Sequence, residues 1–145
     1  MTPDTPRSPL LVLMSLMALV WYVALALDYL AARYDVIATW PLMPEGFGAA
    51  YEVMPLWAAV ASGIAVWLGL FASILLLLRD RMAVLSFAFT FLAAAVVALW
   101  LLLMSEAGPQ PFMGIDPMQM LAAQLLVPLV LWVYARSLKQ RRALA

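Results

Sequence analysis

The sequence predicts an all-α membrane protein: a four-transmembrane-helix bundle whose chain runs up-down-up-down through the bilayer. Hydrophobic residues make up 68% of the 145 residues and charged residues only 11%. That is too little charge to cover the surface of a soluble domain of this length. The mean hydropathy is +1.02. Four apolar runs are each long enough to cross the hydrocarbon core, which takes roughly 20 helical residues.

The first run covers residues 10–32. Hydrocarbon offers no partner for backbone amides, so a spanning segment of this kind is expected to be a helix. Arg7, the apolar run and the small residues Ala24 and Ala26 of "ALA" also fit a secretory signal with its cleavage site. Cleavage there would leave three spans. The length of the run favours a retained span.

Residues 33–54 form the only sizeable loop between spans. Phe47, Tyr51 and Met54 recur in it at helical spacing, after a stretch rich in proline and glycine. This pattern predicts a short amphipathic helix lying on the outer membrane surface. Trp40 before this helix and Trp57 after it are expected at the depth of the lipid headgroups.

The other three spans cover residues 55–78, 82–104 and 117–136, and residues 137–145 form a basic tail. The second and fourth spans begin with a proline, which costs no hydrogen bond in the first turn of a helix. Only "RDR" separates the second span from the third, so these two helices are expected to be antiparallel neighbours.

Basic residues set the expected orientation. They cluster before the first span, in the short turn and after the fourth span: Arg7, Arg79, Arg81, Arg136, Lys139, Arg141 and Arg142. The other two loops are mainly acidic. The positive-inside rule therefore predicts that both termini lie in the cytoplasm. We expect a multi-pass protein of the bacterial cytoplasmic (inner) membrane, with the acidic loops in the periplasm.

Small residues repeat every fourth position on the second and third spans, which places each set on one stripe of its helix. Small stripes let membrane helices approach closely. Facing each other, they would join these two spans, and Ser73 and Ser86 would lie close enough to the turn to hydrogen-bond across it. The same stripes would serve self-association of identical chains. The predicted packing stripe is Ala61, Ala65, Gly69, Ser73, Ser86, Thr90, Ala94 and Ala98.

Two polar features lie within or beside the spans. Gln124 precedes Pro128 by one turn, and the proline leaves the Gln124 carbonyl without its helical partner, which makes this a candidate mid-span polar spot. Asp28 lies toward the outer end of the first span, where an ionised carboxylate costs less than at the bilayer centre. It is a candidate member of a polar cluster at the outer mouth with Arg33, Asp35 and Glu52. An interfacial aspartate anchored by water or by Arg33 is the simpler interpretation.

The chain has no cysteine and no histidine. Cysteine thiolates and imidazoles are the usual ligands of zinc and haem, and histidine is the base of serine hydrolases. We therefore expect no metal site, no cofactor and no catalytic residue, so the protein is not expected to be an enzyme. The formal net charge is zero, which gives no reason to expect a nucleic-acid partner.

Three stretches resemble a family of small four-span bacterial inner-membrane proteins of unknown function, whose members are often labelled "sugar transporter". They are "YEVMPLWAAVASGIAVW" (residues 51–67), "LLLLRDRMAVLSF" (75–87) and "VWYVALALDY" (20–29). The resemblance implies family roles for Trp21, Asp28 and Tyr29. The sequence departs from the family pattern at Tyr22, where asparagine is usual, and at Ala24 or Leu25, where glycine is usual.

Two functions stay open at this point. The first is a non-enzymatic accessory or scaffold protein that associates with itself or with a larger membrane complex. The second is an oligomeric transporter of a small, sugar-like solute, as the family label implies. Apart from the lipid bilayer, the sequence names no partner, and it does not exclude a bound lipid, carotenoid or quinone.

Overall fold

The computed structural model describes residues 8–34, 54–104, 116–141 and 144. These residues form four α-helices and no strand. The helices are α1 (Pro9–Tyr34), α3 (Leu56–Leu78), α4 (Met82–Leu103) and α5 (Pro117–Gln140). The all-α class predicted from the sequence is confirmed.

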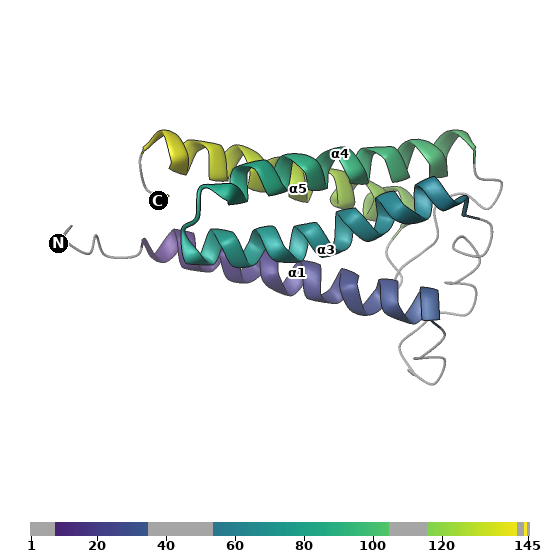
Figure 1. The fold of residues 1–145 in the computed structure, drawn as a ribbon, viewed down its shortest axis with the longest axis horizontal. Helices are drawn as coiled ribbons and strands as arrows, with labels where there is room; N and C mark the ends of the chain where they lie inside the picture. The colour runs from purple at the N-terminus through teal and green to yellow at the C-terminus, as the bar shows by residue number, and fades with distance from the viewer. Residues whose placement is uncertain (1–7, 35–53, 105–115, 142–143, 145) are drawn as a thin grey trace.

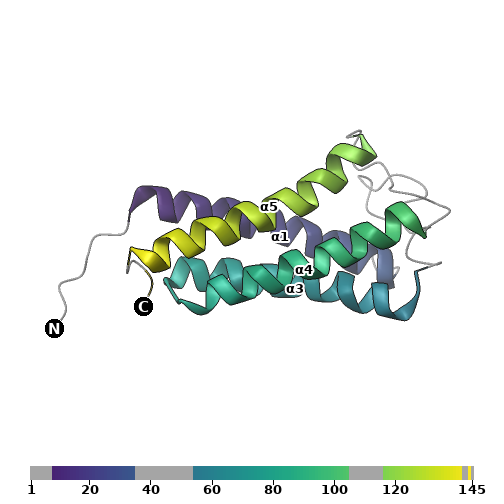
Figure 2. The same cartoon turned by 90° about the horizontal axis from the view of Figure 1, so that it is seen from above.

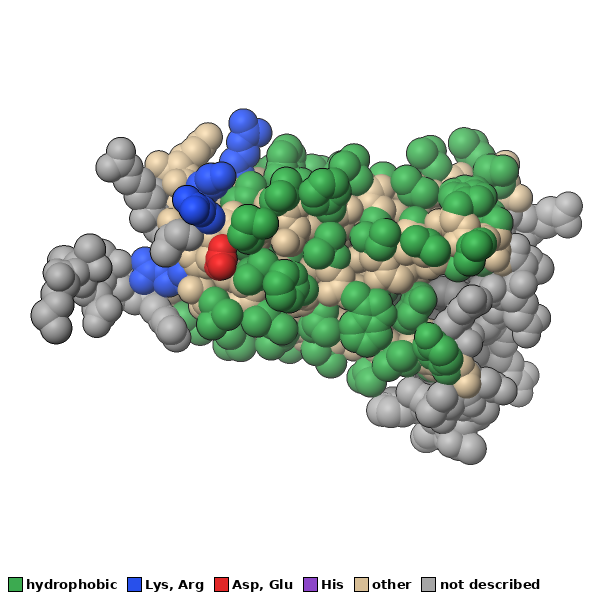
Figure 3. Space-filling view, in the orientation of Figure 1, with side chains coloured by type: hydrophobic (Ala, Val, Ile, Leu, Met, Phe, Trp, Pro, Cys, Tyr) green, Lys and Arg blue, Asp and Glu red, His purple; other side chains and the backbone are tan. Residues whose placement is uncertain are grey.

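All four helices are long and apolar enough to cross a membrane, with mean hydropathies of 1.7 to 2.5 over their spans. Large hydrophobic side chains cover their outer sides, as the space-filling view shows (Figure 3). A soluble protein would hide such side chains from water, whereas lipid accommodates them at no cost. The four predicted spans are therefore confirmed by length and composition, and the side of the membrane that each end faces stays a prediction.

Neighbouring helices run in opposite directions. α3 packs against both α1 and α4, and α5 packs against α4. The start of α1, the turn between α3 and α4 and the end of α5 lie together at one end, which we call the turn end (Figure 1). The end of α1, the start of α3, the end of α4 and the start of α5 lie at the opposite end, which we call the loop end.

The α3–α4 turn is closed by the backbone of two residues after α3. The Arg79 amide donates to the Leu76 carbonyl at 3.1 Å, and the Asp80 amide donates to the Leu75 carbonyl at 2.9 Å. This pair of bonds is the Schellman pattern, and it places Arg79 in the left-handed region at φ 66°. The Asp80 carboxylate then accepts from the Met82 amide at 2.7 Å, at the start of α4.

A cluster of buried hydrophobic side chains lies in the half of the bundle nearer the turn end, although Trp100, Met120 and Leu121 are also buried nearer the loop end. All four helices contribute to this cluster, with Leu144 from the chain's end. At its centre the Tyr22 ring of α1 lies 6.5 Å from the Phe87 ring of α4, between centroids. Toward the loop end α5 diverges from α4 (Figure 2). The core residues are Ala18, Tyr22, Ala72, Leu75, Leu76, Ala83, Phe87, Leu131, Ala135 and Leu144.

The helices differ from the predicted ranges mainly at the end of the fourth span. α5 continues through Gln140, four residues beyond the expected end at 136. Arg136 lies over the Trp132 ring at 5.7 Å, and Lys139 in the last turn faces the negative end of the helix dipole. Both placements favour helical backbone, so part of the predicted tail is helix. The predicted interfacial helix lies outside the described residues, except for Met54.

Candidate functional site

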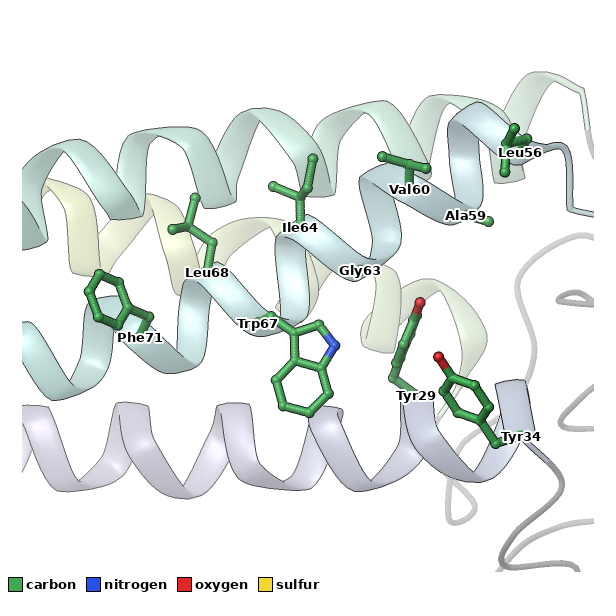
Figure 4. Close-up of a pocket in the computed structure, with 10 residues that line it drawn as sticks. All are labelled: Tyr29, Tyr34, Leu56, Ala59, Val60, Gly63, Ile64, Trp67, Leu68 and Phe71. Atoms are coloured by element: carbon green, nitrogen blue, oxygen red, sulfur yellow. The ribbon is translucent and has the colours of Figure 1, made fainter.

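A groove runs along the outside of the bundle between α1 and α3, from the loop end toward the middle of the span (Figure 4). Its volume is about 710 Å³. The residues of α3 that line it lie between Leu56 and Phe71, a stretch of sixteen residues that rises about 22 Å along the helix. Its outer wall is apolar and exposed, so the groove opens sideways toward lipid.

Aromatic residues of both helices meet in this groove. The rings of Tyr29 and Tyr34 rise from α1 toward α3, and Trp67 extends from α3 toward α1 (Figure 4). The Tyr29 and Trp67 rings meet edge to face, 6.5 Å apart at 85°. The polar tips of the two tyrosines lie nearest the loop end, which is where a membrane protein places amphipathic aromatic side chains.

The floor of the groove is made of small residues. Ala59 and Gly63 are four positions apart on α3 and line it together, with Val60 and Ile64 beside them. A Cβ atom at Gly63 would lie 3.2 Å from the Tyr29 hydroxyl oxygen. The Tyr29 hydroxyl therefore packs against the glycine. Small residues at i and i+4 are the pattern that lets a second membrane helix approach closely.

The two predicted stripes occupy the bundle interior: six of their residues are buried, and Ala65 and Ala94 are half-buried. α3 and α4 are packed together, as neighbours joined by a short turn must be. Gly69, however, receives a side chain from α1, because a Cβ atom there would overlap the Tyr22 ring. At this position the stripe joins α3 to α1, which corrects the expected contact with α4.

The hydroxyl groups of the spans bond within their own helices. Ser73 donates to the Gly69 carbonyl at 2.8 Å, and Thr90 donates to the Ser86 carbonyl at 2.9 Å. Ser15 does the same to the Leu11 carbonyl at 2.7 Å. The expected hydrogen bond from Ser73 across the turn is therefore wrong, since its proton goes to the carbonyl one helical turn earlier.

Asp28 is the only predicted member of the outer-mouth cluster whose side chain the structure describes. Asp35 and Glu52 lie outside the described residues, and of Arg33 only the backbone of α1 is described. Asp28 itself is 8% exposed, which is far more buried than an aspartate at the water interface. Its Oδ1 atom is buried without a hydrogen-bond partner. The interpretation of Asp28 as a hydrated interfacial anchor is therefore not supported.

Two more buried polar atoms on α1 have no hydrogen-bond partner: Trp21 Nε1 and the Tyr22 hydroxyl oxygen. Trp21 precedes Asp28 by seven residues, which is two helical turns along the same side of α1. Within the described chain, α1 therefore carries all the buried side-chain polar atoms that lack a hydrogen-bond partner.

The predicted mid-span spot is assembled only in part. Pro128 lies inside α5 and is fully buried, and Gln124 one turn earlier is half-buried. No hydrogen bond links Gln124 to another helix among the described residues, so the pair stays a prediction as a polar site.

At the turn end, basic side chains of the α3–α4 turn and of α5 gather beside one acidic side chain (Figure 3).

The groove was not predicted from the sequence, although the sequence contains a signal for it. Ala59 and Gly63 form a second small-residue pair on α3, displaced from the predicted stripe, and Tyr29 was singled out only through the resemblance. Among the described residues, no group of three acidic, histidine or cysteine side chains is placed to hold a metal ion.

No known protein family, curated protein or solved structure matches this chain in sequence or fold comparisons. What the arrangement can do must therefore be argued from two features of α1 and α3: the lateral groove and the buried Asp28.

Proposed function

We propose that this protein is a non-enzymatic accessory subunit of the membrane, which holds a transmembrane helix of a partner in the α1–α3 groove. The observation that carries the proposal is the lipid-facing groove itself, whose apolar side chains Val60, Ile64 and Phe71 stand exposed along its length. Since lipid supplies little hydrophobic drive for helix association, close packing in a concave surface of this kind is what joins helices in a bilayer.

The dimensions of the groove fit this role. Its length of about 22 Å corresponds to four turns of a docked helix. Its apolar walls need no charged complement, and the tyrosine tips at the loop end match the depth at which a spanning helix leaves the hydrocarbon. The occupant is a helix of another subunit, either a second copy of this chain or a different protein, as the sequence left open.

Photo-crosslinking from inside the groove tests the proposal. A photoreactive residue placed at Ile64 lies in the groove wall, while one at Phe89 of α4 is equally exposed but lies outside it. In native membranes the Ile64 probe is expected to give one discrete protein adduct, and the Phe89 probe mainly lipid. Mass spectrometry of the adduct distinguishes a second copy from another protein. Equal diffuse labelling from both positions would contradict the proposal.

A blocking substitution supplies an independent check. Val60→Trp fills the groove with a side chain that lipid tolerates, and Val96→Trp places the same ring on the exposed side of α4. We expect the adduct from Ile64 to disappear with Val60→Trp and to persist with Val96→Trp. Its persistence in both variants would show that the partner binds elsewhere.

The second candidate is an oligomeric transporter of a small, sugar-like solute. The buried Asp28 favours it, because intramembrane carboxylates often mark substrate or ion pathways. The hydroxyls of Ser15, Ser73 and Thr90 do not, since each donates to its own helix and lines no path. Uptake of labelled sugars into vesicles that hold the purified protein, compared with empty vesicles and with Asp28→Asn, decides between the two functions.

A further inference from the structure

The burial of Asp28 is unusual for its place in the chain. It lies in the last turn of the span Pro9–Ala31, where water is close, yet 92% of its surface is covered. Oδ1 accepts no hydrogen bond. A carboxylate in this position has lost most of its hydration and has gained no protein donor at that oxygen in return.

The elements around α1 supply no counter-charge in the described chain. Neither α3 nor α4 has an ionisable side chain between its first and last residue. Tyr134, Arg136 and Lys139 of α5 lie in its last two turns, toward the turn end, and Asp116 at its start is exposed and acidic.

On α1 itself, Tyr22, Tyr29 and Tyr34 are the other ionisable groups whose side chains are described, and Tyr34 is exposed. Tyr22 lies against Gly69, and Tyr29 lies over Gly63 in the groove. Arg33 follows Asp28 by five residues, which turns its position about 140° around the helix. It therefore begins on a different face of α1 from Asp28.

An uncompensated carboxylate in such surroundings is strongly disfavoured, whereas the neutral acid is tolerated. We propose that Asp28 is a reversible proton-binding site at the loop end of the bundle, in exchange with the water beyond the end of α1. The step is the binding of one proton by the carboxylate to give the carboxylic acid, and it needs no other reactant. It does not depend on what the groove holds.

Reaction with dicyclohexylcarbodiimide tests this site in the intact protein. The probe is apolar and enters the membrane, and a protonated carboxyl adds across its N=C bond to give an O-acylisourea. In apolar surroundings this adduct rearranges to a stable N-acylurea of the same mass, while an ionised carboxylate does not react. An O-acylisourea that is exposed to water is instead hydrolysed to the free carboxyl and dicyclohexylurea, so a stable adduct reports a buried acid.

The expected result is a single adduct per chain, found on the peptide that contains Asp28. Its initial rate of formation should fall about tenfold per pH unit above one midpoint, within the range from about pH 5 to about pH 10 over which buried carboxyls titrate. Asp28→Asn should abolish the adduct, and Asp28→Glu should keep it. Asp116→Asn is the matched control, because Asp116 is an exposed helix cap, and it should leave the yield unchanged.

A spectroscopic readout keeps the test independent of the probe's access. The infrared spectrum should contain a carboxylic-acid C=O band that vanishes with rising pH and is missing in Asp28→Asn. No adduct and no such band at any pH would overturn the proposal, because the carboxyl would then be permanently ionised. An adduct and band that persist unchanged up to about pH 10 would also overturn it, because binding would not be reversible.

Discussion

The two halves of the bundle are built differently. In the half nearer the turn end, all four helices contribute to one buried cluster, and a tight turn fixes α3 against α4. In the half nearer the loop end, α5 diverges from α4, a groove opens between α1 and α3, and Asp28 is buried without a partner at Oδ1. We therefore expect the half nearer the turn end, which we call the closed half, to contribute more to stability. The half nearer the loop end, which we call the open half, carries the features suited to binding.

The largest expected effect is in the closed half. Phe87 is fully buried on Tyr22, so Phe87→Ala leaves a cavity and should lower the free energy of unfolding by about 3–5 kcal/mol. Phe89 on the same helix is half-exposed to lipid. Phe89→Ala should therefore change the free energy of unfolding by only about 0.5 kcal/mol. Unfolding in mixed micelles by added SDS, followed by circular dichroism, measures both. Equal effects would mean that the closed half is not the stable half.

Two glycines on α3 sharpen the comparison, because one lies in each half. A methyl group at Gly69 would overlap the buried Tyr22 ring, which cannot retreat from Phe87, so Gly69→Ala should destabilise by about 2 kcal/mol or more. Gly63→Ala meets only the end of the Tyr29 side chain, and the better helix propensity of alanine, worth about 1 kcal/mol, should offset that contact. The same SDS titration tests the pair. A larger loss at Gly63 would reverse the assignment of the halves.

The turn allows a prediction of opposite sign. Arg79 has a left-handed backbone, which costs a residue with a Cβ atom about 1–2 kcal/mol. Arg79→Gly should therefore raise the free energy of unfolding by about 1 kcal/mol. Arg81 has an ordinary right-handed backbone at φ −62°, which gains nothing from glycine. Arg81→Gly should therefore lower the free energy of unfolding by about 0.5–1 kcal/mol. If both variants lose stability alike, the arginine side chain contributes more than the backbone geometry.

The smallest effect is expected at Ser73, although it is fully buried in the closed half. Its hydroxyl bonds to the carbonyl of its own helix, and that carbonyl keeps its backbone partner when the hydroxyl is removed. Ser73→Ala should change the free energy of unfolding by less than about 0.5 kcal/mol. A loss above about 1 kcal/mol would show that the hydroxyl joins two helices.

The sequence alone was sufficient to predict the helices. Their number, and their positions to within a few residues, follow from apolar runs and prolines, because hydrocarbon forces each backbone amide to bond within its own segment. The three residues between α3 and α4 also required those helices to be antiparallel neighbours. Gly69 could be placed on a small-residue stripe, but not assigned to Tyr22, because a stripe specifies a face and not the helix that covers it.

Tertiary structure decided what each face contacts. Residues far apart in sequence, such as Tyr29 and Gly63, form the groove only after α1 and α3 have docked. The burial of Asp28 is decided in the same way: its position on α1 allowed an interfacial anchor, and the folded chain leaves it only 8% exposed instead. Helical periodicity is a local property of the chain, whereas burial depends on which helices assemble around a residue.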